Sequence, residues 1–210
     1  MNDSIYSREE TLRTRLNSFL SLHLSVPERD YYAELKPESF LALKSVLADI
    51  NNILTLKVSL SFANWVSSCL HLEESTRQEL LTSILSAKPN SNGFDIWLGH
   101  PIAFVAEVKC NVPINGGKIY GSAQRNGIKK DISALLNGKT KASINPNACL
   151  KFLAFLDLPE IRGATDHFLR SDKANIERLV IVTEKTIFNR TDVVYVVYVT
   201  LDNNQLPRVA

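Results

Sequence analysis

The chain has 210 residues, of which 45% are hydrophobic and 22% are charged. This length and composition fit one globular domain with a small subdomain, and they exclude a fibrous or intrinsically disordered protein. The net charge of +2 is too small to indicate a polyanionic partner, because such binding depends on where charges cluster rather than on their sum.

Cysteine usage and hydropathy favour a cytoplasmic protein. The three cysteines, Cys69, Cys110 and Cys149, are widely spaced and form no CxxC pair, which disfavours a disulfide framework or a structural zinc site. The first residues, MNDSIYSREETLRTR, are polar where a secretory signal needs an apolar run, so we expect no export. No apolar stretch approaches the roughly 20 residues of a membrane span, so we expect no membrane partner.

Residues 1–87 are predicted to be helical, because apolar residues recur there at helical spacing, with breaks at Pro27 and Pro37. Separate helices are expected at 38–56 and 60–71. Ser75 and Gln78 have the spacing of a capping box, which predicts another helix that runs to about Leu85. We therefore assign residues 1–74 to a helical N-terminal region for dimerisation or DNA contact, and residues 75–210 to an α/β core.

Turn-forming residues at 86–93 mark a change from helices to strands. Segments 94–98 and 102–110 are rich in strand-forming apolar residues and predict a hairpin closed by 99–101. Further along, the sequence predicts helices over 123–136 and 172–178, and buried strands over 148–158, 179–183 and 193–201. This order predicts an α/β fold with a central mixed β-sheet flanked by helices.

Two charged residues interrupt the second predicted strand of the hairpin. Side chains alternate between the faces of a strand, so Glu107 and Lys109 point to the same side. Their burial is costly unless they pair, bind a metal or open into a cleft. Asp95 shares this face if the hairpin loop has an odd number of residues. A three-residue loop places Asp95 opposite Val105, one diagonal step from Glu107.

Gly93-Phe94-Asp95, followed by Glu107-Val108-Lys109 on the next strand and then by a helix, resembles the core of the PD-(D/E)xK nuclease superfamily. Phe94 stands where the family pattern has proline. The resemblance implies the restriction-endonuclease-like fold over roughly residues 75–160. It also implies that Asp95, Glu107 and the backbone carbonyl of Val108 bind Mg²⁺, for which Mn²⁺ can substitute. Asp95, Glu107 and Lys109 are then the catalytic residues, with Lys109 positioning and activating the attacking water.

The function implied by this resemblance is Mg²⁺-dependent endonucleolytic cleavage of DNA, in restriction or another antiviral defence system of prokaryotes. The size resembles that of many type II restriction enzymes, which often act as homodimers. Two alternatives stay open: a catalytically silent nuclease-fold protein that binds DNA or serves as a scaffold, and a nuclease that cuts RNA or branched DNA. A structural explanation also stays open, in which Glu107 and Lys109 form an ion pair on an edge strand and Asp95 caps a turn.

Cationic and polar residues around the predicted 123–136 helix are candidates for phosphate contacts, which dominate affinity for nucleic acids. These candidates are Lys118, Gln124, Arg125, Lys129 and Lys130. Gln124 and Lys129 lie on opposite flanks of the apolar edge of this helix, so at least one should reach the cleft. Glu79, an available additional acid, is expected to be a solvated surface residue, because it lies opposite the apolar face of its helix.

Overall fold

The structure is a computed structural model that describes residues 7–87, 93–113, 118–139, 144–171 and 178–201. Contacts divide the chain into two compact units, Met1–Ile50 and Asn51–Ala210. The division falls earlier than the boundary predicted at residue 74, because the second half of a long helix belongs to the unit that contains the sheet.

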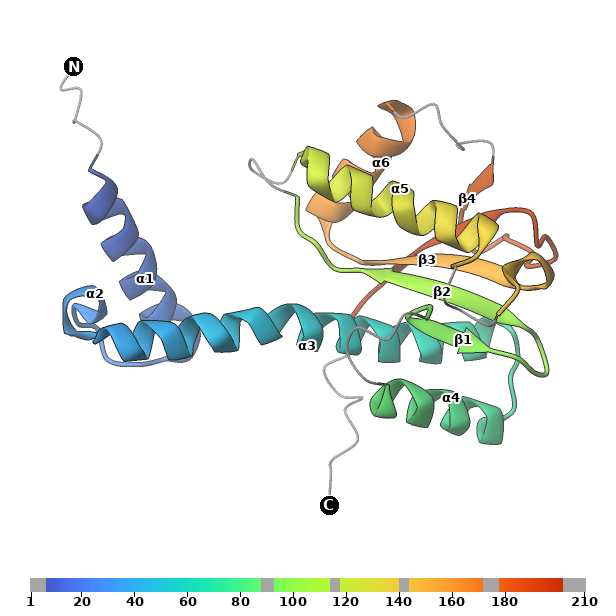
Figure 1. Cartoon of the computed structure of the whole chain (residues 1–210), viewed down its shortest axis with the longest axis horizontal. Helices are drawn as coiled ribbons and strands as arrows, with labels where there is room; N and C mark the ends of the chain where they lie inside the picture. Colours follow the sequence, from blue (N-terminus) through green and yellow to red (C-terminus); the bar gives the residue numbers. More distant parts are fainter. Residues whose placement is uncertain (1–6, 88–92, 114–117, 140–143, 172–177, 202–210) are drawn as a thin grey trace. The chain divides into compact units, whose positions relative to one another are not determined.

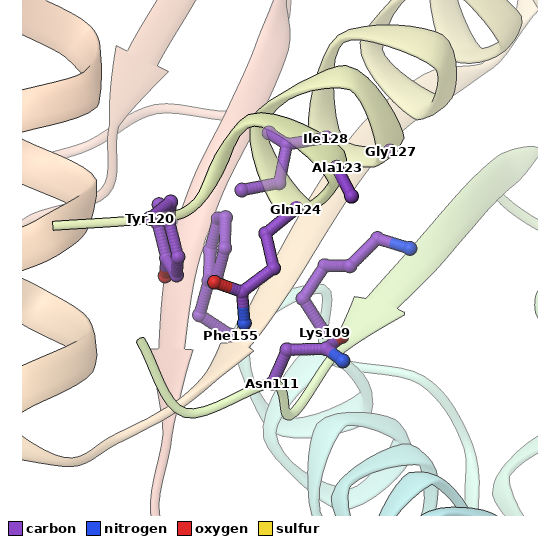
Figure 2. A pocket seen from close by; sticks show the side chains of 8 residues that line it. All are labelled: Lys109, Asn111, Tyr120, Ala123, Gln124, Gly127, Ile128 and Phe155. Atoms are coloured by element: carbon purple, nitrogen blue, oxygen red, sulfur yellow. The ribbon is translucent and has the colours of Figure 1, made fainter. Parts of the chain in front are cut away.

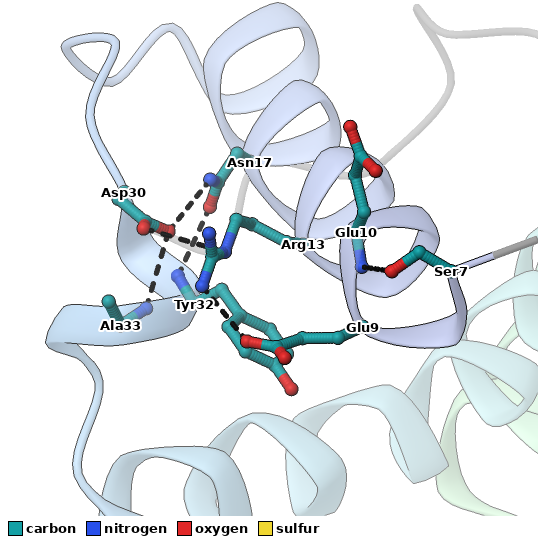
Figure 3. A network of polar contacts seen from close by, with 8 residues as sticks. All are labelled: Ser7, Glu9, Glu10, Arg13, Asn17, Asp30, Tyr32 and Ala33. Carbon is teal, nitrogen blue, oxygen red and sulfur yellow. Dashed lines mark hydrogen bonds and ion pairs between the residues drawn. The ribbon is translucent and has the colours of Figure 1, made fainter. Parts of the chain in front are cut away.

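The N-terminal unit contains helices α1 (Arg8–Leu24) and α2 (Tyr31–Glu34), together with the start of α3 (Pro37–Cys69). Polar contacts hold α1 and α2 together (Figure 3). The Asn17 side chain donates to Asp30 over 3.1 Å and accepts the backbone N–H of Tyr32 over 3.1 Å. Arg13 also lies 3.6 Å from Asp30. Several large apolar side chains of this unit are exposed: Leu12, Phe19, Leu22, Leu24, Leu41, Val46 and Leu47.

Helix α3 runs unbroken for 33 residues, whereas the sequence predicted two helices with a break near residues 57–59. The intervening Lys-Val-Ser contains neither proline nor glycine, so nothing there interrupts a helix. Among the described residues, one helix, α3, is long and apolar enough to cross a membrane, judged by length and composition only. In its second half, however, Val58, Phe62 and Val66 recur at a spacing of four residues and are fully buried in the core.

The second unit is built on a five-stranded mixed sheet with helices on both faces (Figure 1), which confirms the predicted α/β class and flanked sheet. The strands lie in the order β1-β2-β3-β5-β4, with β1 antiparallel to β2 and the other neighbours parallel. The second half of α3 and α4 cover one face, while α5 and α6 cover the other. The elements are α4 (Glu74–Ser86), β1 (Ile96–Leu98), β2 (Phe104–Lys109), α5 (Ser122–Asn137), a short 3-10 helix (Pro146–Ala148), β3 (Leu150–Leu156), α6 (Pro159–Ser171), β4 (Leu179–Ile181) and β5 (Val194–Val199).

One local prediction is wrong, one helix was not predicted and one prediction is not tested. Helix α4 begins at Glu74 without a side-chain cap, and Gln78 donates to the carboxylate of Glu74 instead of completing a capping box with Ser75. Helix α6 was not predicted, although Ile161, Ala164, Thr165 and Phe168 form a buried stripe at helical spacing. The helix predicted over 172–178 falls almost wholly outside the described residues.

An aromatic cluster fills the space between α3 and the sheet. The ring of Phe62 lies 6.3 Å from Phe104 and 5.5 Å from Phe152, both in edge-to-face arrangements. Phe152 also lies 5.6 Å from Tyr195 on β5. Since residues alternate along β2, Phe104 faces α3 whereas Glu107 and Lys109 face α5.

Candidate active site

The observed hairpin brings Asp95 to the face that Glu107 and Lys109 share. Ile96 pairs with Ala106 and Leu98 with Phe104, so the loop has five residues rather than the predicted three. Continuing this register by one residue places Asp95 level with Glu107 instead of level with Val105. Because five is also odd, Asp95 lies on the predicted face of the sheet. The residue predicted to lie opposite it, Val105, is wrong.

Asp95 is exposed and is held by the neighbouring strand. Its Oδ2 accepts a hydrogen bond from the backbone N–H of Val108 over 2.8 Å. Its charge acts on both Glu107 and Lys109. The carboxylate predicted to be the first metal ligand therefore lies within electrostatic reach of the other two predicted catalytic side chains. The Val108 side chain is buried on the opposite face.

Glu107 is a carboxylic acid in a nearly dry position, with 3% of its surface exposed. Burial, and next the charge of Asp95, raise the pKa of Glu107 to about 7, although contact with Lys139 opposes this shift. Burial disfavours the ionised form because the carboxylate loses water, and a second anion disfavours it further. Glu107 therefore needs a cation in order to stay ionised.

Lys109 pairs with a carboxylate from α5. Its ammonium contacts Oδ2 of Asp131, and the two side chains are 22% and 16% exposed. Burial alone would lower the pKa of Lys109, but Asp131, Asp95 and Glu107 together outweigh it and raise that pKa. Lys109 is consequently a protonated ammonium at neutral pH, suited to orienting a water or an anion and unsuited to removing a proton.

A second lysine completes the charge cluster, which we define as Asp95, Glu107, Lys109, Asp131 and Lys139. The ammonium of Lys139 lies 2.5 Å from Oε1 of Glu107 and donates to the carbonyl of Gly93 over 2.7 Å. It also sits 5.1 Å from the centre of the Phe94 ring. Sequence reasoning did not include Asp131 or Lys139 in the site. Asp131 could have been found in the sequence as the one carboxylate that borders the apolar edge of the predicted 123–136 helix.

A cavity of about 310 Å³ adjoins Lys109 at the carboxyl ends of β2 and β3 (Figure 2). Its walls include the rings of Tyr120 and Phe155, and the Lys109 ammonium points away from these rings. The amide of Gln124 also lines the cavity. This amide accepts the N–H of Gly121 over 3.1 Å and donates to the carbonyl of Val112 over 2.9 Å, so it fixes the start of α5.

The other residues predicted to contact nucleic acid are exposed but do not form one surface. Arg125 and Lys129, four residues apart, share a flank of α5 different from the one that carries Asp131. Lys130 lies on the outer face of α5, because it is two residues from each of the buried Ile128 and Ile132. Lys118 is exposed on the turn before α5, and Glu79 is exposed on α4.

The chemistry of the cluster fits a magnesium ion. Mg²⁺ prefers oxygen ligands, keeps several waters and uses one or two carboxylates of the protein. In the described part of the chain, neither Oε1 of Glu107 nor Oδ2 of Asp131 receives a hydrogen bond of normal geometry, although each contacts a lysine ammonium. Within the same residues no group of three or more His, Cys, Asp and Glu side chains is arranged to hold a metal. A magnesium ion would therefore depend on Asp95, Glu107, backbone and water oxygens.

The fold and the cluster define a three-layer α/β protein with two lysines and three carboxylates gathered beside an edge hairpin of a mixed sheet. The chain matches no protein-family model, no curated protein and no solved structure.

Proposed function

We propose that this chain is a metal-dependent nuclease of the PD-(D/E)xK type with a restriction-endonuclease-like core, and that it hydrolyses DNA phosphodiester bonds with Mg²⁺. The observation that supports this proposal most strongly is the gathering of Asp95, Glu107 and Lys109 on one face of the hairpin. The buried Glu107 is the central element, since burying a carboxylate is costly unless a cation pairs with it, and carboxylates with strongly raised pKa values cluster at functional sites.

Each side chain has a role that follows from its surroundings. Asp95 and Glu107, with the backbone carbonyl of Val108, are the proposed ligands of the ion. A bound divalent ion would supply charge neutralisation at the phosphate and a water of lowered pKa. Lys109 holds the attacking water and offsets negative charge at the phosphate, and Asp131 keeps its ammonium in place. These roles need no proton transfer to Lys109.

The substrate and setting are part of the same proposal. Lys130 and Lys118 are exposed cations suited to phosphate contacts. We place the enzyme in the cytoplasm, in restriction or another antiviral defence system, and propose that it acts as a homodimer. RNA and branched DNA have the same phosphodiester chemistry, so the cleavage assay described below includes both as substrates.

The second candidate is a nuclease-fold protein that binds DNA without cutting it. The observation that favours it is the contact of Lys139 with Glu107, which already supplies this acid with a cation. A protein of this kind would bind DNA equally well in Mg²⁺ and in EDTA.

A cleavage assay with matched variants separates these candidates. Purified protein is incubated with plasmid, linear duplex, single-stranded and branched DNA and with RNA, in Mg²⁺ or EDTA. We expect Mg²⁺-dependent cutting that falls at least about 100-fold in Asp95→Asn, Glu107→Gln and Lys109→Met, an effect typical of groups that act on the transition state. Glu79→Gln, on the exposed face of α4, is the control and should cut normally.

Undiminished cutting by the three site variants would show that the active site lies elsewhere. No cutting of any substrate, together with DNA binding in a gel-shift assay, would support the silent protein instead.

A further inference from the structure

Lys139 makes contacts that are unusual for a lysine just beyond the end of a helix. Its ammonium joins two oxygens from separate parts of the chain, Oε1 of Glu107 and the carbonyl of Gly93. The Phe94 ring lies beside it, and three quarters of the side chain is covered. A buried carboxylate, a carbonyl and an aromatic face together surround one positive charge.

The backbone directs Lys139 to this position. Helix α5 ends at Asn137, and Gly138 follows with a φ of +93°, in the left-handed region that glycine adopts without strain. The chain therefore turns sharply after α5. A Cβ at Gly138 would also approach Cδ of Pro146 to 3.4 Å. The turn at Gly138 therefore places Lys139 where it contacts Glu107.

The charges of the cluster explain why such a contact is needed. Asp95, Glu107 and Asp131 carry three negative charges when ionised, and Lys109 and Lys139 carry two positive ones. Lys109 is already paired with Asp131. Lys139 is thus the cation in direct contact with Glu107, whereas Lys109, which also interacts with Glu107, is held by its ion pair with Asp131.

We propose that Lys139 is an internal counter-ion that occupies the place of the divalent ion at Glu107 in the metal-free protein and must leave it when metal binds. This inference rests on the proposed function for the identity of the ion. It goes further by linking metal binding to release of Lys139 from Glu107 and from the Gly93 carbonyl. Lys139 is a positioning residue that stabilises the empty site and weakens its affinity for metal.

The test compares metal binding and metal-free stability in the full chain. Mn²⁺ is titrated by isothermal calorimetry at pH 8 into wild type, Lys139→Met, Lys139→Arg, Glu107→Gln and Lys185→Met. Lys185 is exposed on the turn after β4 and serves as the control for loss of one positive charge. Thermal unfolding of each variant is followed by circular dichroism in EDTA and in Mn²⁺.

We expect Lys139→Met to bind Mn²⁺ about tenfold more tightly than wild type, equivalent to about 1.4 kcal/mol. In EDTA it should unfold several degrees lower than wild type, because Glu107 loses its partner, and Mn²⁺ should restore the difference. Lys139→Arg keeps the charge and should resemble wild type in both measurements, as should Lys185→Met. Should Lys139→Met fail to fold, Lys139→Gln replaces it in the same titration.

An Mn²⁺ affinity of Lys139→Met equal to or weaker than that of wild type would overturn the counter-ion proposal, even if Mg²⁺-dependent cutting upheld the nuclease. Tighter Mn²⁺ binding that is lost in Glu107→Gln, without cutting of any nucleic acid, would uphold the counter-ion and refute the nuclease. Absence of Mn²⁺ binding in every variant would overturn both.

Discussion

Glu107 is a single residue in which protonation, folding and metal binding are linked. Its carboxyl group is almost fully covered and has Asp95 nearby, so the ionised form depends on a cation. In the metal-free protein that cation is Lys139. Because its pKa is about 7, Glu107 gains or loses its proton near neutral pH. The charge of the site therefore changes in a pH range where most carboxyl groups stay ionised.

The raised pKa of Glu107 predicts how stability changes with pH in EDTA. The folded protein holds this proton up to about pH 7, whereas the unfolded chain releases it near pH 4.5. Between these values the folded state binds more protons, so the free energy of unfolding falls as pH rises. Glu107→Gln should remove from this slope a contribution of about 3 kcal/mol. Urea unfolding at pH 4.5 and pH 8 measures it for both proteins, and identical pH dependence would contradict the assigned shift.

At the scale of elements, α3 has two halves with different surroundings. Phe62 in the second half is fully buried and contacts rings from β2 and β3. Leu41 in the first half has 66% of its surface exposed. A single regular helix therefore contributes core packing at one end and a largely exposed apolar surface at the other.

This difference predicts that two alanine substitutions in α3 have effects of very different size on stability. Phe62→Ala should lower the free energy of unfolding by about 3–5 kcal/mol, because a large ring leaves a cavity among Phe104, Phe152 and Trp65. Leu41→Ala should change it by less than about 0.5 kcal/mol, as expected for an exposed position. Denaturant unfolding of both variants tests this, and an equal loss in the two would show that the halves are packed alike.

At the scale of the whole molecule, the charge cluster lies entirely in the unit Asn51–Ala210. The same unit contains all five strands and the aromatic cluster. The unit Met1–Ile50 has its own polar network, yet leaves many large apolar side chains exposed.

A chain that begins at Asn51 should therefore fold without the preceding residues, since domains with their own core fold independently. We expect cooperative thermal unfolding with a midpoint close to that of the second unit in the full chain. Circular dichroism measures this, and a non-cooperative melt would show that residues before Asn51 complete the core.

Sedimentation of the two chains also tests the predicted role in dimerisation, because loss of a dimer on truncation would place its interface in the removed residues.

The sequence by itself determined the features that depend on neighbouring residues. Alternation along one strand placed Glu107 and Lys109 on the same face, and it required an odd loop length for Asp95 to join them. Apolar spacing located α5 and the strands β3, β4 and β5 to within a few residues, although β4 is half-buried to exposed rather than buried as predicted. The α/β class followed from the order of these elements.

Only the tertiary structure decided which partners these residues have. The hairpin register moved Asp95 from Val105 to Glu107, because loop length is set by how the turn closes rather than by strand composition. The contacts of Asp131 and Lys139 depend on how α5 packs across β2, and that packing is a property of surfaces far apart in the sequence. Local patterns predict where a charged side chain points, whereas its neutralising partner depends on the folded core.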